Sequence, residues 1–243
     1  MHSIRTFPVE QIIISPIPDS FPFRAILFDL DGTLVDSFTP IHSSFGYALD
    51  RLGIAKKLNW NEMMRLVGTS LEDSFRKLVP EYQVHDAVER FREHYNQVVL
   101  DQTFPLPGAG DLLRNLCIQG NPAAVITNKK GDAARRILTH LDLLAHLRFC
   151  LGEADGFREK PAPDMILEGL KRLGTLPSET LFLGDSPYDF HAARAAEVPV
   201  GLLPTGTHNT EELKALGPDF FFPDLIGFSH WWFSSHGSPP DGT

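Results

Sequence analysis

Short apolar runs, each followed by a segment with helical periodicity, constrain the fold of this chain more than any other feature. The clearest runs are residues 25–28 (AILF), 123–127 (AAVIT), 180–183 (TLFL) and 200–203 (VGLL), with a further one at 148–151 (RFCL). Runs of this length without polar alternation are typical of strands buried on both faces of a sheet. Because helical segments connect them, the sequence predicts an α/β fold, a Rossmann-like parallel sheet with helices on both faces.

The segment between residues 37 and 103 has a different, purely helical pattern. Phe45, Leu49 and Leu52 recur at helical spacing, and similar sets continue to Val98 without a strand pattern between them. We therefore expect residues 37–103 to form an inserted α-helical cap domain, and residues 23–36 and 104–228 to form the core.

The two ends of the chain are expected to lie outside this core. Residues 1–22 form an N-terminal extension whose apolar stretch is short and interrupted by prolines. Residues 229–243 are expected to form a partly disordered C-terminal tail, in which Trp231 and Trp232 are candidates for packing on the core.

Polar residues follow the predicted strands at the edge where open parallel sheets bind ligands. They are Asp29 and Asp31 after the first strand, Thr127 and Asn128 at the second, Lys160 in the connection after the third, and Asp185 and Asp189 after the fourth. Any one of these residues is common as a helix cap or turn residue. Since four separate segments deliver them to one edge, the sequence predicts a single site.

These residue types suit phosphoryl transfer through an aspartyl-phosphate. Asp29 is the candidate nucleophile, and its charge repels an incoming phosphate unless a cation lies between them. Mg²⁺ prefers hard oxygen ligands, and Asp29 and Asp185 arrive from two strand ends to hold it. Lys160 adds positive charge beside the phosphate, while the Thr127 hydroxyl and the Asn128 backbone N–H bind phosphoryl oxygens.

Asp31 has a separate predicted role. Side chains two residues apart on a strand point in the same direction, so Asp29 and Asp31 flank one phosphate. We expect Asp31 to protonate the leaving alcohol and then to deprotonate the attacking water. Gly32 permits the tight turn that follows.

The segments DLDGTLVDS, VITN, KPAPD and GDSPYD resemble, in order and spacing, the four motifs of the haloacid dehalogenase superfamily, on its phosphatase side. The resemblance implies a Rossmann-like core with an α-helical cap inserted after the first strand. It implies Mg²⁺ held by the Asp29 carboxylate, the Asp31 backbone carbonyl and Asp185, with Asp189 supporting the metal site. The superfamily's dehalogenases lack the second aspartate of the first motif, so Asp31 places this chain with the members that transfer phosphate.

Within the superfamily, the cap followed by FPLPGAGDLLRNL resembles phosphoglycolate phosphatases and their pyrophosphatase and nucleotidase neighbours. The predicted function is therefore a Mg²⁺-dependent phosphatase for a small phosphomonoester. The alternatives are a pyrophosphatase or nucleotidase, a phosphomutase of the β-phosphoglucomutase kind, and a binding protein with an inactive enzyme fold. His42 is the candidate cap residue for the phosphomutase, although its spacing from Asp29 is one residue too long and favours a packing role.

The resemblance also leads to expectations for a loop of the cap and for the helix end at Glu197. Relatives use a loop of the cap for substrate contact, and Gly68 to Ser70 lie in the corresponding loop, so Gly68 and Ser70 are candidate substrate-binding residues. Relatives usually have glycine at the position of Glu197, where a left-handed helix cap costs glutamate about 1 kcal/mol. We therefore expect a different helix end at Glu197.

The formal charge of −9 argues against a nucleic-acid or anionic-membrane surface and suits a site that holds a cation. The expected partner is a small phosphorylated metabolite, bound by a monomer or homodimer. Two cysteines and the absence of a convincing signal peptide or of a long apolar run favour a cytoplasmic protein.

Overall fold

A computed structural model of the chain describes residues 13–14 and 22–236, and the remainder lies outside the described residues. The strands are β1 (Ile13–Ile14), β2 (Ala25–Phe28), β3 (Val35–Asp36), β4 (Phe104–Pro105), β5 (Ala123–Lys130), β6 (Cys150–Glu153), β7 (Thr180–Gly184), β8 (Val200–Leu202) and β9 (Phe220–Phe221). The α-helices are α1 (Phe38–Arg51), α2 (Trp60–Met64), α3 (Leu71–Arg76), α4 (Val84–Gln102), α5 (Ala109–Ile118), α6 (Gly131–His140), α7 (Asp164–Leu173), α8 (Pro187–Ala195), α9 (Thr210–Ala215) and α10 (Leu225–His236).

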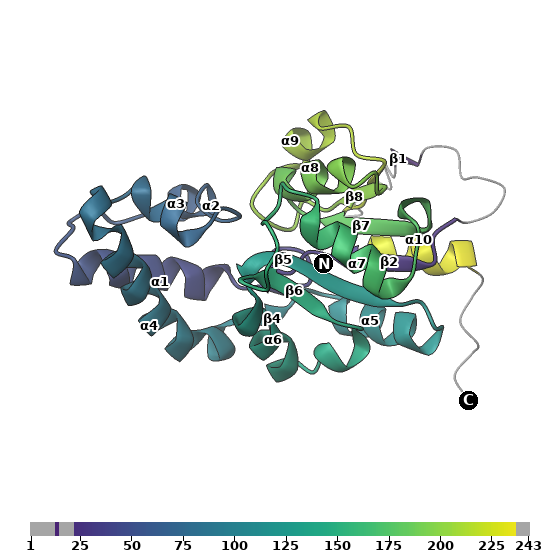
Figure 1. Ribbon diagram of the computed structural model, residues 1–243, viewed down its shortest axis with the longest axis horizontal. Helices are drawn as coiled ribbons and strands as arrows, with labels where there is room; N and C mark the ends of the chain where they lie inside the picture. The colour runs from purple at the N-terminus through teal and green to yellow at the C-terminus, as the bar shows by residue number, and fades with distance from the viewer. Residues whose placement is uncertain (1–12, 15–21, 237–243) are drawn as a thin grey trace, which may run out of the picture.

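Seven strands of the described residues form one sheet in the order β1-β9-β8-β7-β2-β5-β6. The pairing between β1 and β9 is antiparallel, and the other five pairs are parallel. Helices cover both faces of this sheet, with α7 and α8 on one face and α5 and α6 on the other (Figure 1). The predicted α/β fold with a Rossmann-like parallel sheet is confirmed.

The central strand β2 contributes alternate side chains to two apolar clusters. Ile26 and Phe28 belong to the cluster that includes α5, α6 and α10, and Leu27 belongs to the cluster under α7, α8 and α9. All three side chains are fully buried. Because successive side chains on a strand point to opposite faces, a continuous apolar run is what a strand covered on both faces requires.

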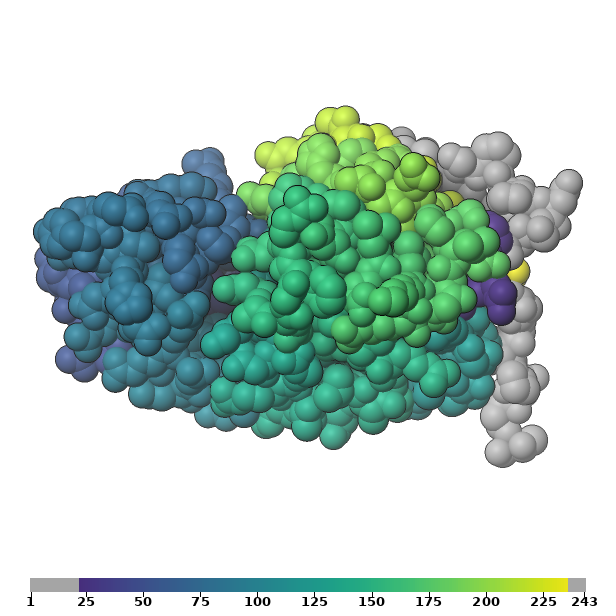
Figure 2. All heavy atoms as spheres, in the orientation of Figure 1, coloured from purple at the N-terminus to yellow at the C-terminus, as the bar shows by residue number. Residues whose placement is uncertain are grey.

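Helices α1 to α4 form a helical insertion, residues 37–103, between β3 and β4. Those two short strands pair with each other, so the insertion leaves and rejoins the rest of the chain at one place. It lies to one side of the large sheet (Figure 1), and a crease separates the two parts on the surface (Figure 2). Inside it, Phe45, Phe75 and Phe91 pack with ring centroids 4.9–6.1 Å apart.

The last part of the described chain is the helix α10. Helix α10 crosses the expected boundary between residues 228 and 229 and ends at His236, whereas residues 237–243 lie outside the described residues. Trp231 and Trp232 pack among Phe228 and Phe222, and Trp232 is fully buried, as the sequence suggested for both tryptophans. In the described part of the chain, no helix is long and apolar enough to cross a membrane.

Glu197 corrects one sequence-based expectation. Instead of a different helix end, the chain keeps the left-handed turn, with a φ of 58° at Glu197. The N–H of Val198 donates to the carbonyl of Ala193 at 2.9 Å, and the N–H of Glu197 donates to that of Arg194 at 3.1 Å. This is a Schellman motif, and it delivers the buried Val198 toward β8. The requirement to bury Val198 outweighs the preference of this position for glycine.

We expect Glu197→Gly to raise the free energy of unfolding by about 1 kcal/mol, because glycine adopts positive φ without the steric cost that Cβ imposes. Urea unfolding of the variant and the parent protein measures this difference. Glu211→Gly, in the first turn of α9, is the control and should be destabilising, since that residue is helical. A loss of stability in Glu197→Gly would contradict the assignment of the turn.

Candidate active site

Three adjacent strands bring the predicted site residues together. Strand β2 lies between β7 and β5, and all three run parallel. Asp29 follows β2, Asp185 follows β7, and Thr127 lies within β5, so these residues share the carboxyl edge of the sheet. The N–H of Asp29 donates to the carbonyl of Leu183 at 2.9 Å, which ties the first of these residues directly to β7.

Lys160 lies at the centre of this edge and is only 4% exposed. Its Nζ donates to Asp29 Oδ1 at 2.7 Å, to Asp189 Oδ1 at 2.6 Å and to the carbonyl of Ile126 at 3.0 Å. The Asn128 side chain holds the backbone of Lys160 from both sides, since its Oδ1 accepts from the Lys160 N–H and its Nδ2 donates to the Lys160 carbonyl, each at 2.8 Å. Asn128 therefore positions the lysine, a role that the sequence did not suggest.

The three aspartates Asp29, Asp185 and Asp189 form a buried carboxylate cluster. One oxygen from each lies within 4.8 Å of one oxygen from the other two. Burial, reinforced by Asp189, raises the pKa of Asp29 to about 7 even though Lys160 opposes the shift. Burial, with Asp189 and Asp29, also raises the pKa of Asp185 well above its ordinary value. One ammonium thus leaves part of the negative charge of this cluster uncompensated.

The chemistry of this cluster fits a hard divalent cation. Asp189 is already engaged, because its Oδ2 accepts from the Ser186 hydroxyl at 2.6 Å while its Oδ1 accepts from Lys160. Asp29 Oδ2 accepts no hydrogen bond from the described residues, and Asp185 Oδ1 accepts one at 3.0 Å from Thr33. Asp185 and Asp29 Oδ1, which accepts only from Lys160, therefore keep lone pairs for a metal ion while Asp29 Oδ2 stays open, and Asp189 holds their surroundings in place.

Two glycines allow the chain to close around Asp185. A Cβ atom at Gly206 would lie 1.7 Å from Asp185 Oδ2, and one at Gly32 would lie 2.7 Å from the same atom. Gly32 also has a φ of +84°, which few other residues adopt. Thr205 Oγ1 donates to the carbonyl of Gly32 at 2.6 Å and so joins the loop after β8 to the loop after β2.

Asp31 has different neighbours from the carboxylate cluster. Lys129 Nζ donates to its Oδ1 at 2.9 Å and to its Oδ2 at 2.8 Å, and the Ser37 hydroxyl donates to Oδ1 as well. Burial lowers the pKa of Lys129, but Asp31 and Tyr95 together outweigh burial and raise that pKa above its usual range. The two aspartates of the first motif therefore have separate cationic partners, Lys160 for Asp29 and Lys129 for Asp31.

The helical insertion contributes Gly68 to this region, but Ser70 is used elsewhere. The carbonyl of Gly68 accepts from Asn128 Nδ2 at 3.0 Å, and a Cβ there would lie 3.0 Å from the Tyr188 ring. Ser70 Oγ instead accepts from the N–H of Asp73 and caps the start of α3. Ser70 does not line the cavity described below, but its hydroxyl keeps a proton to donate, so its role in substrate binding stays a prediction.

His42 has a packing role. Its Nε2 lies 2.8 Å from the carbonyl of Leu58, and its ring packs against Trp60 with centroids 5.5 Å apart. It does not line the cavity described next.

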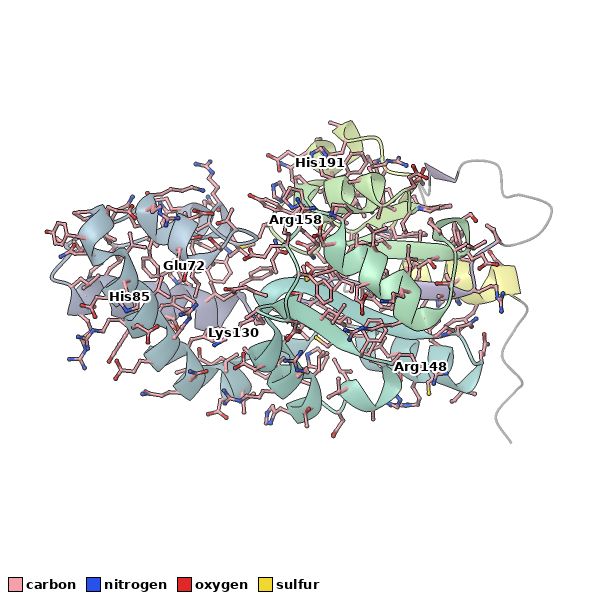
Figure 3. All side chains as sticks on the ribbon, viewed as in Figure 1. Glu72, His85, Lys130, Arg148, Arg158 and His191 are labelled. Atoms are coloured by element: carbon pink, nitrogen blue, oxygen red, sulfur yellow. The ribbon has the colours of Figure 1, made fainter. Side chains whose placement is uncertain are left out.

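A cavity of about 180 Å³ joins the sheet edge to the helical insertion. Its polar wall includes Asp29, Asp31, Thr127, Asn128, Lys129 and Lys160, and its apolar wall, from the insertion, includes Ile41, Phe45, Leu66, Phe91 and Tyr95. In Figure 3, Glu72 of α3 and Lys130 at the end of β5 lie on the two sides of this junction. A small molecule in the cavity would contact both parts of the protein.

Comparison with known proteins agrees with this geometry. The family model of haloacid dehalogenase-like hydrolases matches residues 26–203, from β2 to the end of β8. The chain belongs to the haloacid dehalogenase-like hydrolase family.

Curated relatives of this hydrolase include proteins named as phosphoglycolate phosphatases and one named as a pyrophosphatase. A phosphoglycolate phosphatase of Aquifex aeolicus is 30% identical over 197 residues, which cover 81% of this chain and 91% of the relative. The phosphoglycolate phosphatase of Escherichia coli K12 is 29% identical over 227 residues (83% and 89%). A protein of Caldanaerobacter subterraneus subsp. tengcongensis, named as a candidate pyrophosphatase, is 30% identical over 209 residues (83% and 90%).

Solved structures share the architecture of this hydrolase. A haloacid dehalogenase-like family protein from Streptococcus pneumoniae superimposes with a TM-score of 0.80 at 25% identity, covering 87% of this chain and 99% of the other. The same values hold for a predicted phosphoglycolate phosphatase from Haemophilus somnus. The resemblance that the four sequence motifs carry is therefore confirmed for the family.

Mg²⁺ should stabilise this hydrolase more at about pH 8 than at about pH 5.5. Burial raises the pKa of Asp29 in the folded protein from its ordinary value of 3.8 to about 7, so without Mg²⁺ the free energy of unfolding falls as the pH rises between these values. Mg²⁺ offsets that loss, and it competes with the bound proton only below pH 7. At a free concentration a hundredfold above Kd the gain is about 2.7 kcal/mol.

Thermal unfolding with Mg²⁺ and with EDTA at both pH values measures this effect. Asp185→Asn should remove most of the Mg²⁺-dependent shift, whereas Asp111→Asn, at an exposed carboxylate of α5, should leave it unchanged. A shift of the same size in all three proteins would mean that Mg²⁺ binds elsewhere.

Proposed function

We propose that this hydrolase is a Mg²⁺-dependent phosphatase that hydrolyses a small phosphomonoester through an aspartyl-phosphate on Asp29. The observation that carries the proposal is the state of the Asp29 carboxylate. Its Oδ1 is held by Lys160, its Oδ2 accepts no hydrogen bond from the described residues, and the residue lines the cavity. A buried carboxylate fixed at one oxygen and open at the other suits a nucleophile.

In the first step, Asp29 Oδ2 attacks phosphorus and the bond from phosphorus to the ester oxygen breaks. Lys160 neutralises charge beside the transferring group, and the hydroxyl of Thr127, whose oxygen accepts from the Lys129 N–H at 3.1 Å, keeps its proton to donate to a phosphoryl oxygen. Asp31, which lines the same cavity, gives a proton to the leaving alkoxide. Asp29, Asp185 and the Asp31 backbone carbonyl would hold Mg²⁺, and the ion would supply the positive charge that lets a carboxylate approach a phosphate.

In the second step, water attacks the phosphorus of the aspartyl-phosphate. Asp31, now ionised, takes a proton from that water, and the bond between phosphorus and Asp29 breaks. Inorganic phosphate leaves, and both aspartates return to their starting states. One carboxylate thus acts as an acid and then as a base, so the enzyme regains its starting protonation state while one water molecule is consumed.

Two observations favour a phosphatase for monoesters over the alternatives. His42, the candidate residue for a phosphomutase, packs against Leu58 and Trp60 and does not line the cavity. The relatives named as phosphoglycolate phosphatases support a small phosphorylated metabolite as substrate, while the one named as a pyrophosphatase makes pyrophosphate the second compound to test. We further propose that the helical insertion acts as the cap, since its apolar side chains close the far wall of the cavity.

Asp29→Asn should reduce the turnover of p-nitrophenyl phosphate to background, because an amide oxygen does not form the acyl-phosphate. The variant keeps the shape of the side chain, so its fold should survive. Nitrophenolate release with Mg²⁺ measures turnover, and circular dichroism checks the fold. Asp111→Asn serves as the control with full activity, and turnover close to that of the parent protein in Asp29→Asn would refute the proposed nucleophile.

Asp31→Asn should separate the two chemical steps. The second step needs a base whatever the substrate, so steady-state turnover should fall by about 10²–10⁴-fold. The first step on p-nitrophenyl phosphate hardly needs an acid, since nitrophenolate leaves unaided. Rapid mixing should therefore show a burst of about one nitrophenolate per site in this variant, because the covalent aspartyl-phosphate forms and then accumulates. Unchanged steady-state turnover would rule out Asp31 as the acid–base residue.

A further inference from the structure

Lys129 is a buried lysine with no role in the steps derived above. Its side chain is 9% exposed, and its Nζ contacts both carboxylate oxygens of Asp31, at 2.9 and 2.8 Å. The neighbouring Lys130, by comparison, is 47% exposed and has Asp132 at 3.9 Å as its ion-pair partner. Two consecutive lysines at the end of β5 thus have very different surroundings.

The contacts of Lys129 fix the orientation of the Asp31 carboxylate. An ammonium that donates to both oxygens restrains rotation of the carboxylate, and the Ser37 hydroxyl adds a second donor on Oδ1. Oδ2 accepts only from Lys129 among the described residues, so it keeps a lone pair for a proton. Oδ1 of Asp31 therefore accepts two hydrogen bonds, while Oδ2 accepts one and stays available for proton transfer.

Lys129 is itself held from the helical insertion. Its Nζ lies 5.1 Å from the centre of the Tyr95 ring, a distance typical of a cation–π contact. Tyr95 belongs to α4 and is 6% exposed. Lys129 consequently joins three segments of the chain: the end of β5, the loop after β2 and the longest helix of the insertion.

A role in stability alone explains this arrangement poorly. Removing two charges from water costs several kcal/mol per ion before their attraction repays it, so a buried ion pair is weak evidence for a stabilising role. The transferring phosphate already has Lys160 beside its nucleophile. What the Lys129 contacts provide is a fixed direction for the Asp31 carboxylate.

We propose that Lys129 is the positioning residue for the acid–base step, and that it acts by orienting the carboxylate of Asp31. The inference rests on the proposed function, because it assigns a role to Lys129 only through Asp31. A misplacement of about 1 Å in a proton-transferring group costs about a hundredfold in rate. Loss of Lys129 should therefore affect the proton-transfer steps and leave substrate binding nearly unchanged.

A double-mutant cycle between Lys129 and Asp31 tests the proposal. Lys129→Met keeps the length of the side chain and removes its donors. With an alkyl phosphate as substrate, this variant should lose about 10–100-fold in kcat with little change in KM. With p-nitrophenyl phosphate it should still give a burst of about one nitrophenolate per site. In the Asp31→Asn background, Lys129→Met should cause no further loss, because the group that it orients is gone.

Lys171→Met, at an exposed lysine of α7 that does not line the cavity, is the matched control, and it should keep the kcat of the parent protein on both substrates. Losses from Lys129→Met and Asp31→Asn that multiply in the double variant would overturn the proposal. So would a rise in KM at unchanged kcat, which would make Lys129 a substrate-binding residue. The thermal shift with Mg²⁺ confirms that each variant is folded, and Lys129→Gln replaces Lys129→Met in the same cycle if the latter does not fold.

The same cycle separates failure of this inference from failure of the proposed function. If Asp31→Asn alone keeps full turnover, Asp31 is not the acid–base residue and the role of Lys129 falls with it. If Asp31→Asn shows the burst and the lost turnover while the two substitutions act independently, the proposed function stands and only the inference is wrong.

Discussion

The buried ammonium of Lys160 is the contact on which the rest of the site depends. It lies between Asp29, which follows β2, and Asp189, which belongs to α8, and it allows these two carboxylates to lie close together away from water. Removing one partner of such a pair leaves an uncompensated buried charge and typically costs about 3–5 kcal/mol. The backbone of Lys160 is in turn held by the side chain of Asn128. A residue of β5 thus positions a residue of the connection between β6 and α7.

Much of this arrangement could be predicted from the sequence because the signals are local. Apolar runs with helical segments between them identify parallel strands, and the polar residues after each run must then meet at one edge. Asp29, Thr127, Lys160 and Asp185 were assigned to the site in this way, and the structure places all four along one wall of the cavity. The family followed from the same residues read as motifs.

Other features depend on contacts between residues far apart in the chain, which local patterns do not record. Lys129 and Asp31 are 98 residues apart, and Thr205 and Gly32 are 173 residues apart. Helix α10 was missed for a different reason. Its serines and histidines are spread around the helix among large aromatic residues instead of gathering on one face, so it lacks the periodicity that marks an amphipathic helix. Glu197 shows the opposite case, in which tertiary packing outweighs a local preference.

The alternation along β2 links folding accuracy to chemistry. Ile26 and Phe28 fill one apolar cluster, Leu27 fills the other, and Asp29 continues the same strand into the site. Side chains on β2 alternate between the two faces of the sheet. This alternation decides which cluster each apolar side chain joins, and it also decides the direction in which the Asp29 side chain points. A slip of one residue between β2 and its neighbours would exchange the two faces of the strand and, in the same movement, displace Asp29 from Lys160. A chain that pairs this strand wrongly is therefore both poorly packed and inactive, so a measurement of activity in this hydrolase also counts the molecules in which β2 is in register.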